Sequence, residues 1–128
     1  FRLPTEGQWE YACRAGTTEA CYGSLDAIGW YDGNSRFKTH PIGQKQANAW
    51  GLHDMLGNVY EWCNDRYSDG YYSVSPIKDP VGPSSGLERV IRGGCWSYGA
   101  KCCRAANRIW DSPSGRGSYL GFRLLLAK

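Results

Sequence analysis

Six cysteines and two histidines carry the most reactive side chains of this sequence. No two cysteines have CxxC spacing, and His40 and His53 lie far from any cysteine pair, so the pattern does not indicate a structural zinc site. Cys102 and Cys103 are adjacent, and neighbouring side chains of an extended chain point in opposite directions, which makes them a poor two-thiolate clamp. The pattern favours free or buried thiols, with disulfides or a metal site as the alternatives.

Neither histidine has a neighbour in sequence that would make it a general base. No Ser–His–Asp or Cys–His arrangement can be assembled from the spacing of the candidate residues. We therefore interpret both histidines as loop residues held by hydrogen bonds. Catalysis is not supported by the residues themselves.

The C-terminal part of the sequence has a composition suited to recognition. Residues that look structural alternate there with tyrosine, serine, glycine and aspartate. Aromatic rings supply large, rigid contact area, and small polar residues adapt and form hydrogen bonds. We expect Tyr98, Trp110 and Tyr119 to be apolar anchors and Asp111 and Ser118 to add polar selectivity. The alternative for Trp110 is a place in the core.

The elements that must position these residues are short. A helix is predicted over residues 2–14, with Thr5 as its N-cap and Gln8 completing a capping box. Trp9 and Cys13 share one face of that helix and should be buried.

Three strands are predicted, over residues 59–63, 90–94 and 120–126. Residues 65–87 form a long loop rich in Tyr, Ser, Pro and Gly, and residues 16–41 are irregular. There is no internal repeat, and loops should outnumber regular elements.

Length and charge exclude several classes of protein. The 128 residues suffice for one domain, and the formal net charge of +3 with scattered lysines and arginines does not indicate a nucleic-acid partner. No segment approaches the roughly 20 apolar residues that a membrane-spanning helix needs.

Four blocks, at residues 2–12, 48–62, 89–96 and 121–124, together resemble the formylglycine-generating enzyme (sulfatase-modifying factor) family. Their order matches the second half of that family. The resemblance implies an α+β, C-type-lectin-like fold with a small twisted antiparallel sheet, about two helices and long loops. We expect one such domain over residues 1–128, lacking the family's N-terminal portion.

Most residues of these blocks are interpreted as scaffolding. Gly93 and Gly94 permit backbone angles that other residues adopt only under strain, and Arg92 and Arg123 can bridge carbonyls and carboxylates with several donors each. Trp96, in the same block as the glycine pair, is expected in the core.

The family's enzymes use a pair of copper-binding cysteines, because copper(I) prefers soft thiolate ligands. The resemblance places the first of these positions on Tyr98 and the second near Cys103. Cys103 begins the segment 103–108, which looks like the structural motif of non-catalytic relatives. The resemblance therefore implies a non-enzymatic protein, with a formylglycine-generating oxidase as the alternative.

Within the family, the pattern is most similar to the variable proteins of diversity-generating retroelements, in which asparagine codons randomised at adenines yield Tyr, Ser, Ile, Asp, Gly or Cys. Residues 89–123 would then be the variable ligand-binding segment, although Trp110 and Lys101 fit this substitution pattern less easily. An ordinary, non-diversified binding or structural member is the alternative. The candidate contact residues are Ile91, Cys95, Ser97, Tyr98, Gly99, Cys102, Ile109, Trp110, Asp111, Ser112, Gly115, Gly117, Ser118 and Tyr119.

The resemblance also implies a calcium site at Asp54, Gly57, Val59 and Glu61, through two side chains and two backbone carbonyls. The alternative is that Glu61 pairs with an arginine and Asp54 accepts hydrogen bonds from loop amides. The expected function requires no cofactor.

The expected partner is a protein or cell-surface ligand of a phage, a bacterium or an archaeal host. A virion or cell surface is the corresponding location. The sequence leaves the identity of the ligand and the oligomeric state open.

Overall fold

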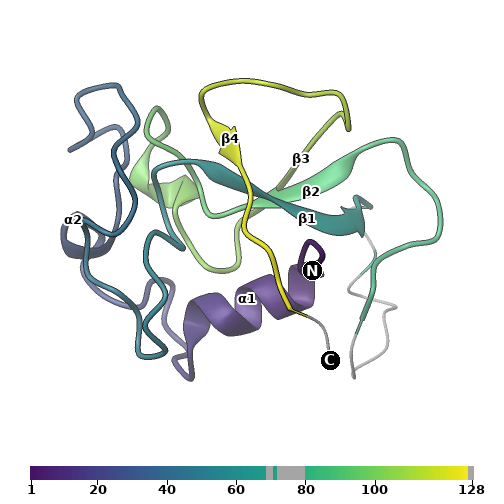
Figure 1. The fold of residues 1–128 in the computed structure, drawn as a ribbon, viewed down its shortest axis with the longest axis horizontal. Coiled ribbons are helices and arrows are strands. Elements are labelled where there is room, and N and C mark those ends of the chain that lie inside the picture. The colour runs from purple at the N-terminus through teal and green to yellow at the C-terminus, as the bar shows by residue number, and fades with distance from the viewer. Residues whose placement is uncertain (69–70, 72–79, 127–128) are drawn as a thin grey trace.

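A computed structural model describes residues 1–68, 71 and 80–126 of the chain. A curled sheet lies between helix α1 on one side and the loop that joins the last two strands on the other (Figure 1). This arrangement confirms the expected α+β class; part of the predicted loop over 65–87, residues 69–70 and 72–79, lies outside the described residues. The elements are α1 (Glu6–Arg14), α2 (Leu25–Ile28), β1 (Tyr60–Arg66), β2 (Arg89–Arg92), the short 3-10 helix η1 (Ala100–Cys102), β3 (Arg108–Asp111) and β4 (Leu120–Gly121).

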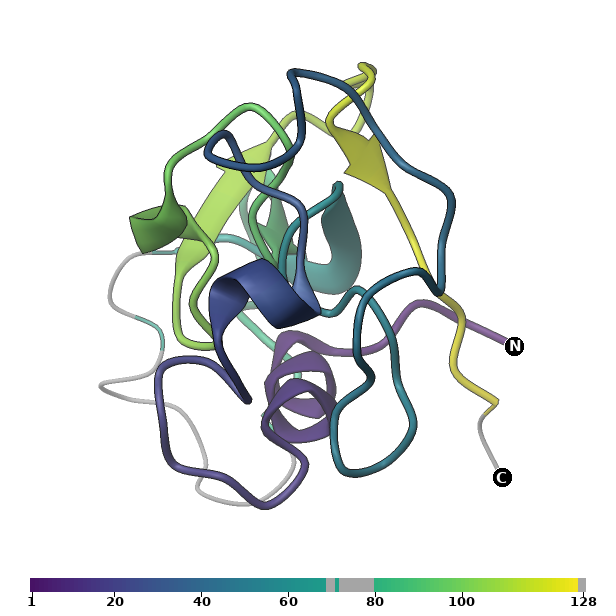
Figure 2. The same ribbon diagram turned by 90° about the vertical axis from the view of Figure 1, so that its left-hand side faces the viewer.

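The sheet has the strand order β3-β2-β1-β4 and is mixed. β1–β2 and β2–β3 are antiparallel, as expected, but β4 runs parallel to β1, with Tyr60 opposite Leu120. β4 has two residues because the chain then leaves the sheet, and Leu125 forms an isolated bridge with Arg2. The predicted strand over 120–126 is therefore shortened, and the two terminal segments lie side by side (Figures 1 and 2).

Helix α1 begins at Glu6 because of the residues before it. Leu3 precedes a proline, which disfavours the helical conformation. The predicted cap at Thr5 is confirmed: Thr5 Oγ1 accepts from the Gln8 amide at 3.1 Å, and Gln8 Oε1 accepts from the Thr5 amide at 2.9 Å. Trp9 and Cys13 are buried as expected, and the helix ends at Arg14, with the C-cap residue Ala15 in the left-handed region at φ 47°.

Two hydrophobic clusters pack on opposite sides of the sheet. Val90 belongs to the cluster that contains Trp9 of α1, whereas Ile91 belongs to the cluster around Tyr60. This alternation is that of neighbouring residues in a strand. We call the side that faces α1 the helix side and the other the outer side. Trp96, expected in the core, lies half-buried against the outer cluster.

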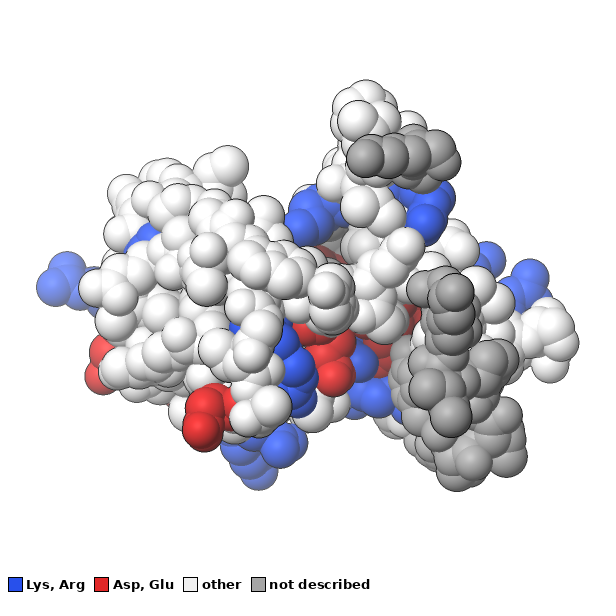
Figure 3. Space-filling view, turned by 90° about the horizontal axis from the view of Figure 1, so that it is seen from below, with Lys and Arg blue, Asp and Glu red and all other residues white. Residues whose placement is uncertain are grey.

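A buried ion cluster, formed by Glu6, Glu10, Arg92 and Arg108, ties α1 to two strands. Glu6 is fully buried and accepts from Arg92 Nε at 2.7 Å and from Arg108 Nη2 at 2.9 Å. Arg92 Nη1 also donates to Glu10 at 2.9 Å. Viewed from below, acidic and basic side chains gather in a hollow of the surface (Figure 3). The cluster fixes the helix against the sheet that carries the C-terminal segment.

The glycine pair that follows β2 allows the chain to pass close to other backbone. Gly93 and Gly94 have φ values of 103° and 75°, in the region that glycine tolerates. A Cβ on Gly93 would lie 2.6 Å from the Met55 carbonyl oxygen, and one on Gly94 would lie 2.5 Å from Cys103 Sγ. Both glycines therefore have the scaffolding role expected of them.

Candidate ligand-binding surface

Twelve of the fourteen predicted contact residues are exposed or half-buried. Ile91 and Cys95 are the exceptions, with 1% and 0% exposure, and the prediction of ligand contact is wrong for both. Ile91 lies in β2, paired with strands on both sides, and points into the outer cluster. Cys95 follows the glycine turn and packs into the same cluster beside Tyr60.

The strand β3 divides its residues between the two sides of the sheet. Arg108 bonds to Glu6 of α1, and Trp110 is paired with Val90 of the helix-side core and stacks on Tyr67 with ring centroids 4.6 Å apart. Ile109 packs instead against the outer cluster. Trp110, 50% exposed, is thus a surface residue and not a core residue, but it lies on the helix side. Of the three predicted apolar anchors, Trp110 therefore lies on the other side of the sheet from Tyr98 and Tyr119.

The outer side carries Tyr98, Asp111, Ser118 and Tyr119, which we call the outer patch. The Tyr119 hydroxyl donates to Asp111 Oδ2 at 2.6 Å. This bond raises the pKa of the Tyr119 phenol, with smaller contributions from burial and from the nearby Asp111 and Tyr98. Tyr98, 48% exposed, meets the edge of Tyr60 with ring centroids 5.8 Å apart.

Hydrogen bonds to main-chain carbonyls hold the backbone of three residues of the outer patch. The Tyr98 carbonyl accepts from the Asp32 amide at 3.0 Å, and the Tyr119 carbonyl accepts from the Tyr60 amide at 2.7 Å. The Ser118 carbonyl accepts from the indole nitrogen of Trp96 at 3.0 Å. None of these three bonds uses a side-chain atom of the patch. The patch side chains can therefore be replaced while the bonds that place their backbone remain.

All six cysteines are free thiols in the structure. Burial raises the pKa of Cys103 to about 12, so this thiol is protonated at neutral pH. Cys102 is half-buried next to it, and Tyr98 stands at the other position that the resemblance assigns to a copper ligand. Burial and the neighbouring thiols of Cys102 and Cys95 raise the pKa of the Tyr60 hydroxyl as well.

The carboxylate of Glu61 does not fit the predicted calcium site as it is arranged. Arg123 forms two hydrogen bonds to Glu61, both 2.7 Å, and the Trp9 indole donates to the same carboxylate at 2.8 Å. A guanidinium group therefore stands where a cation would have to bind. Asp54 Oδ2 accepts from the Gly43 amide at 2.8 Å, while its buried Oδ1 has no partner. Calcium stays a prediction for this chain, with Asp54 as the ligand that is still available.

Sequence reasoning missed Trp62 and Arg89, which border the outer side. Trp62 is half-buried and packs against the outer cluster, and Arg89 is paired with Asp111 across the strands. The signal for Trp62 was its spacing of two residues from Tyr60 in a strand, which places both side chains on one face. Arg89 could be placed only with the register of β2 against β3.

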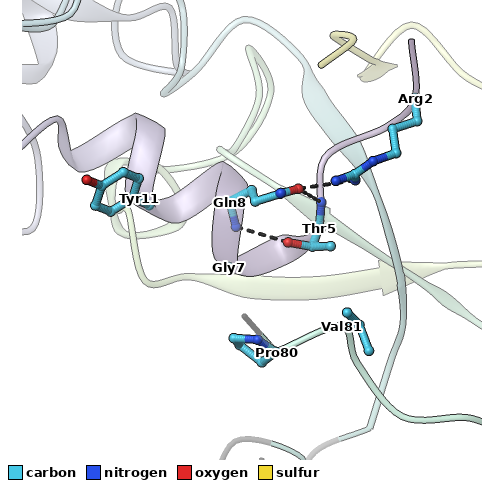
Figure 4. A pocket seen from close by; sticks show the side chains of 7 residues that line it. All are labelled: Arg2, Thr5, Gly7, Gln8, Tyr11, Pro80 and Val81. Carbon is cyan, nitrogen blue, oxygen red and sulfur yellow. Dashed lines mark hydrogen bonds between the residues drawn. The ribbon is translucent and has the colours of Figure 1, made fainter. Parts of the chain in front are cut away.

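A second hollow, of about 440 Å³, lies at the start of α1 (Figure 4). Its polar side chains are committed to the helix cap, since Arg2 Nη1 also donates to Gln8 Oε1 at 3.2 Å. Gly7 and Tyr11 complete the α1 part of its wall, and Pro80 and Val81 lie opposite. None of the predicted contact residues lines this hollow.

The sequence and the fold match known proteins over nearly the whole chain. The family model for the sulfatase-modifying factor enzyme 1-like domain matches residues 1–128. A formylglycine-generating enzyme of Streptomyces coelicolor is 36% identical in an alignment 142 residues long that covers 95% of this chain and 45% of that protein. A serine/threonine-protein kinase pkn1 of Chlamydia caviae is 41% identical over 95% of this chain and 20% of its own length.

Two solved structures superpose closely. Treponema denticola variable protein 1 has a TM-score of 0.89 and 43% identity, covering 94% of this chain and 45% of that one. PvdO from Pseudomonas aeruginosa has a TM-score of 0.84 and 30% identity, covering 94% and 50%. The chain thus spans half or less of each of these relatives, and its fold is C-type-lectin-like. It belongs to the sulfatase-modifying factor enzyme 1-like family, the family that the four sequence blocks indicate.

Proposed function

We propose that this domain is a non-enzymatic, ligand-binding module that displays a diversified surface on a fixed scaffold, as a variable protein of a diversity-generating retroelement. The observation that carries the proposal is the main-chain anchoring of the outer patch. Residues of the type expected at variable positions project their side chains, while carbonyls of the same residues are held by Asp32, Tyr60 and Trp96. The similarity to Treponema denticola variable protein 1 supports the same interpretation.

The chemistry of the patch is that of a protein-binding surface. It offers two tyrosine rings beside a carboxylate and a serine, a combination that gives rigid apolar contact with polar selectivity. The ligand we propose is a protein or another component of a cell surface, and the domain would act at the surface of a virion or a cell. None of the helices in the described part of the chain has the length and apolarity that a bilayer crossing requires.

Two features favour ligand binding over formylglycine-generating chemistry. A tyrosine stands at the first of the two positions assigned to copper thiolates, and the thiol at the second, Cys103, is fully buried with a raised pKa. A copper(I) site needs accessible, deprotonated sulfur. We expect the purified protein, supplied with copper(I) and oxygen, to leave a cysteine-containing sulfatase peptide unmodified by mass spectrometry. Conversion of that cysteine to formylglycine would overturn the proposal in favour of the enzyme.

The genetic test addresses diversification directly. The source DNA should contain, beside a reverse transcriptase, a near-copy of the codons for residues 89–123 that differs from them at adenines. Sequencing of independent isolates should then show changes at Tyr98, Asp111, Ser118 and Tyr119, and constancy at Arg92 and Gly93. An invariant segment without such a copy would instead indicate an ordinary, non-diversified binding or structural member of the family.

A further inference from the structure

A cavity of about 350 Å³ opens beside the outer patch. It adjoins the patch in two ways: Arg89 is paired across the strands with Asp111, and Pro113 lies in the loop that follows β3. The residues that line it are Leu3, Trp62, Cys63, Asn64, Arg89 and Pro113.

The cavity presents hydrogen-bond donors and contains no acidic side chain. Arg89 Nη1 donates to the Asn64 carbonyl at 2.6 Å, which holds the guanidinium in place. Within the described part of the chain, Arg89 has no carboxylate partner, and the indole N–H of Trp62 and the side-chain amide of Asn64 form no hydrogen bond. These groups together suit an anionic acceptor, because a guanidinium binds a carboxylate with several parallel donors.

The acidic residue nearest in the strand pairing is already engaged. Asp111 lies opposite Arg89, yet its Oδ2 accepts from Tyr119 and its Oδ1 accepts from the Ser112 amide at 2.7 Å. Arg89 therefore keeps its donor capacity for a ligand. The negative charge of Asp111 reduces the positive electrostatic potential around Arg89, but no ion pair joins the two side chains.

We propose that this cavity is a fixed subsite for an acidic side chain, aspartate or glutamate, of a protein ligand. The inference rests on the proposed function, and it adds a constant anchor beside the changing residues. Arg89 would pair with the carboxylate, and Leu3, Pro113 and the Trp62 ring would cover the aliphatic part of the side chain. A protein is favoured over an acidic saccharide because the adjoining patch combines tyrosines with serine and aspartate, as protein-binding surfaces do.

The test uses the 128-residue protein and two blocked peptides, acetyl-Ala-Glu-Ala-amide and its glutamine counterpart. Amide and indole NMR signals of Trp62, Asn64 and Arg89 should shift on titration with the glutamate peptide and stay in place with the glutamine peptide. Arg89→Gln should weaken binding about three- to fivefold, the size of a half-exposed ion pair. Lys38→Gln, which removes the same charge from an exposed site away from the cavity, should leave binding unchanged.

A variant that is expected to bind the glutamate peptide more tightly distinguishes loss of the subsite from loss of the fold. Asp111→Asn removes the competing charge and should strengthen binding of the glutamate peptide by about two- to fivefold. Equal shifts with both peptides, no shift with either, or saturation by methyl glucuronide without a response to the glutamate peptide would each overturn the subsite. None of these results would contradict the proposed function of the outer patch, because that function is tested separately by the sequence variation of residues 89–123.

Discussion

Replacing Glu6 by glutamine should produce the largest loss of stability of any single isosteric change in this domain. Glu6 is fully buried in the first turn of α1 and receives hydrogen bonds from two arginines that belong to β2 and β3. Glutamine keeps the volume of the side chain but removes its charge. Arg92, which is only 2% exposed, would then lose the Glu6 carboxylate that compensates its buried charge.

The expected magnitude follows from the burial of the pair. Removing one partner of a buried ion pair typically destabilises a protein by about 3–5 kcal/mol. Arg92 retains Glu10 and the Ala105 carbonyl, and Arg108 is 18% exposed, so we expect a value near the lower end, about 3 kcal/mol. For a domain of this size that corresponds to a decrease in Tm of roughly 10 °C.

Urea unfolding monitored by tryptophan fluorescence measures this change, with thermal unfolding as a second readout. Glu19→Gln is the matched control, because Glu19 is exposed and its side chain forms no ion pair among the described residues. The control should remain within about 0.5 kcal/mol of the natural protein. A Glu6→Gln loss below about 1 kcal/mol would refute the view that the ion cluster fixes α1 to the sheet.

Three further outcomes are expected. Tyr119→Ser should lower the free energy of unfolding by about 1–2 kcal/mol in urea, because the part-buried bond to Asp111 and the packing of the ring against the outer cluster are lost; a loss above about 3 kcal/mol would show that the fold depends on Tyr119. Burial raises the pKa of Asp65 above its value in the unfolded chain, so its contribution to stability is complete below the unfolded pKa and is lost as pH rises through the folded pKa. The stability of Asp65→Asn relative to the natural protein, measured by chemical denaturation, should therefore increase as pH rises from below the unfolded pKa through the folded pKa of Asp65, and a constant difference would contradict this. Glu61→Gln should destabilise the domain by about 2–3 kcal/mol in calcium and in chelator alike, because its partners are Arg123 and Trp9; a loss confined to calcium-containing buffer would favour the calcium site.

Local signals predicted the parts of the fold that depend on neighbouring residues. The Thr5 cap with Gln8, the buried face of Trp9 and Cys13, and the glycine pair before Cys95 follow from short-range rules of helix and turn geometry. They are set by backbone sterics and hydrogen bonds within a few residues. These features could be expected without coordinates.

The features that sequence reasoning missed depend on strand register and on contacts between distant segments. The side of the sheet occupied by Trp110, and the burial of Ile91, are fixed by the pairing of β2 with β3. The parallel placement of β4 depends on the path of the loop that precedes it. The binding of Arg108 to Glu6, 102 residues apart, has no local signature.

The central claim is that the outer patch can change its side chains without loss of the fold. A variant carrying Tyr98→Ser, Asp111→Asn, Ser118→Tyr and Tyr119→Ser tests it directly by thermal unfolding and circular dichroism. We expect a cooperative transition with Tm within about 10 °C of the natural protein, since single changes at such positions are small and Asp111 and Tyr119, which bond to each other, lose one shared interaction. Loss of the cooperative transition, or a decrease in Tm above about 15 °C, would contradict the claim.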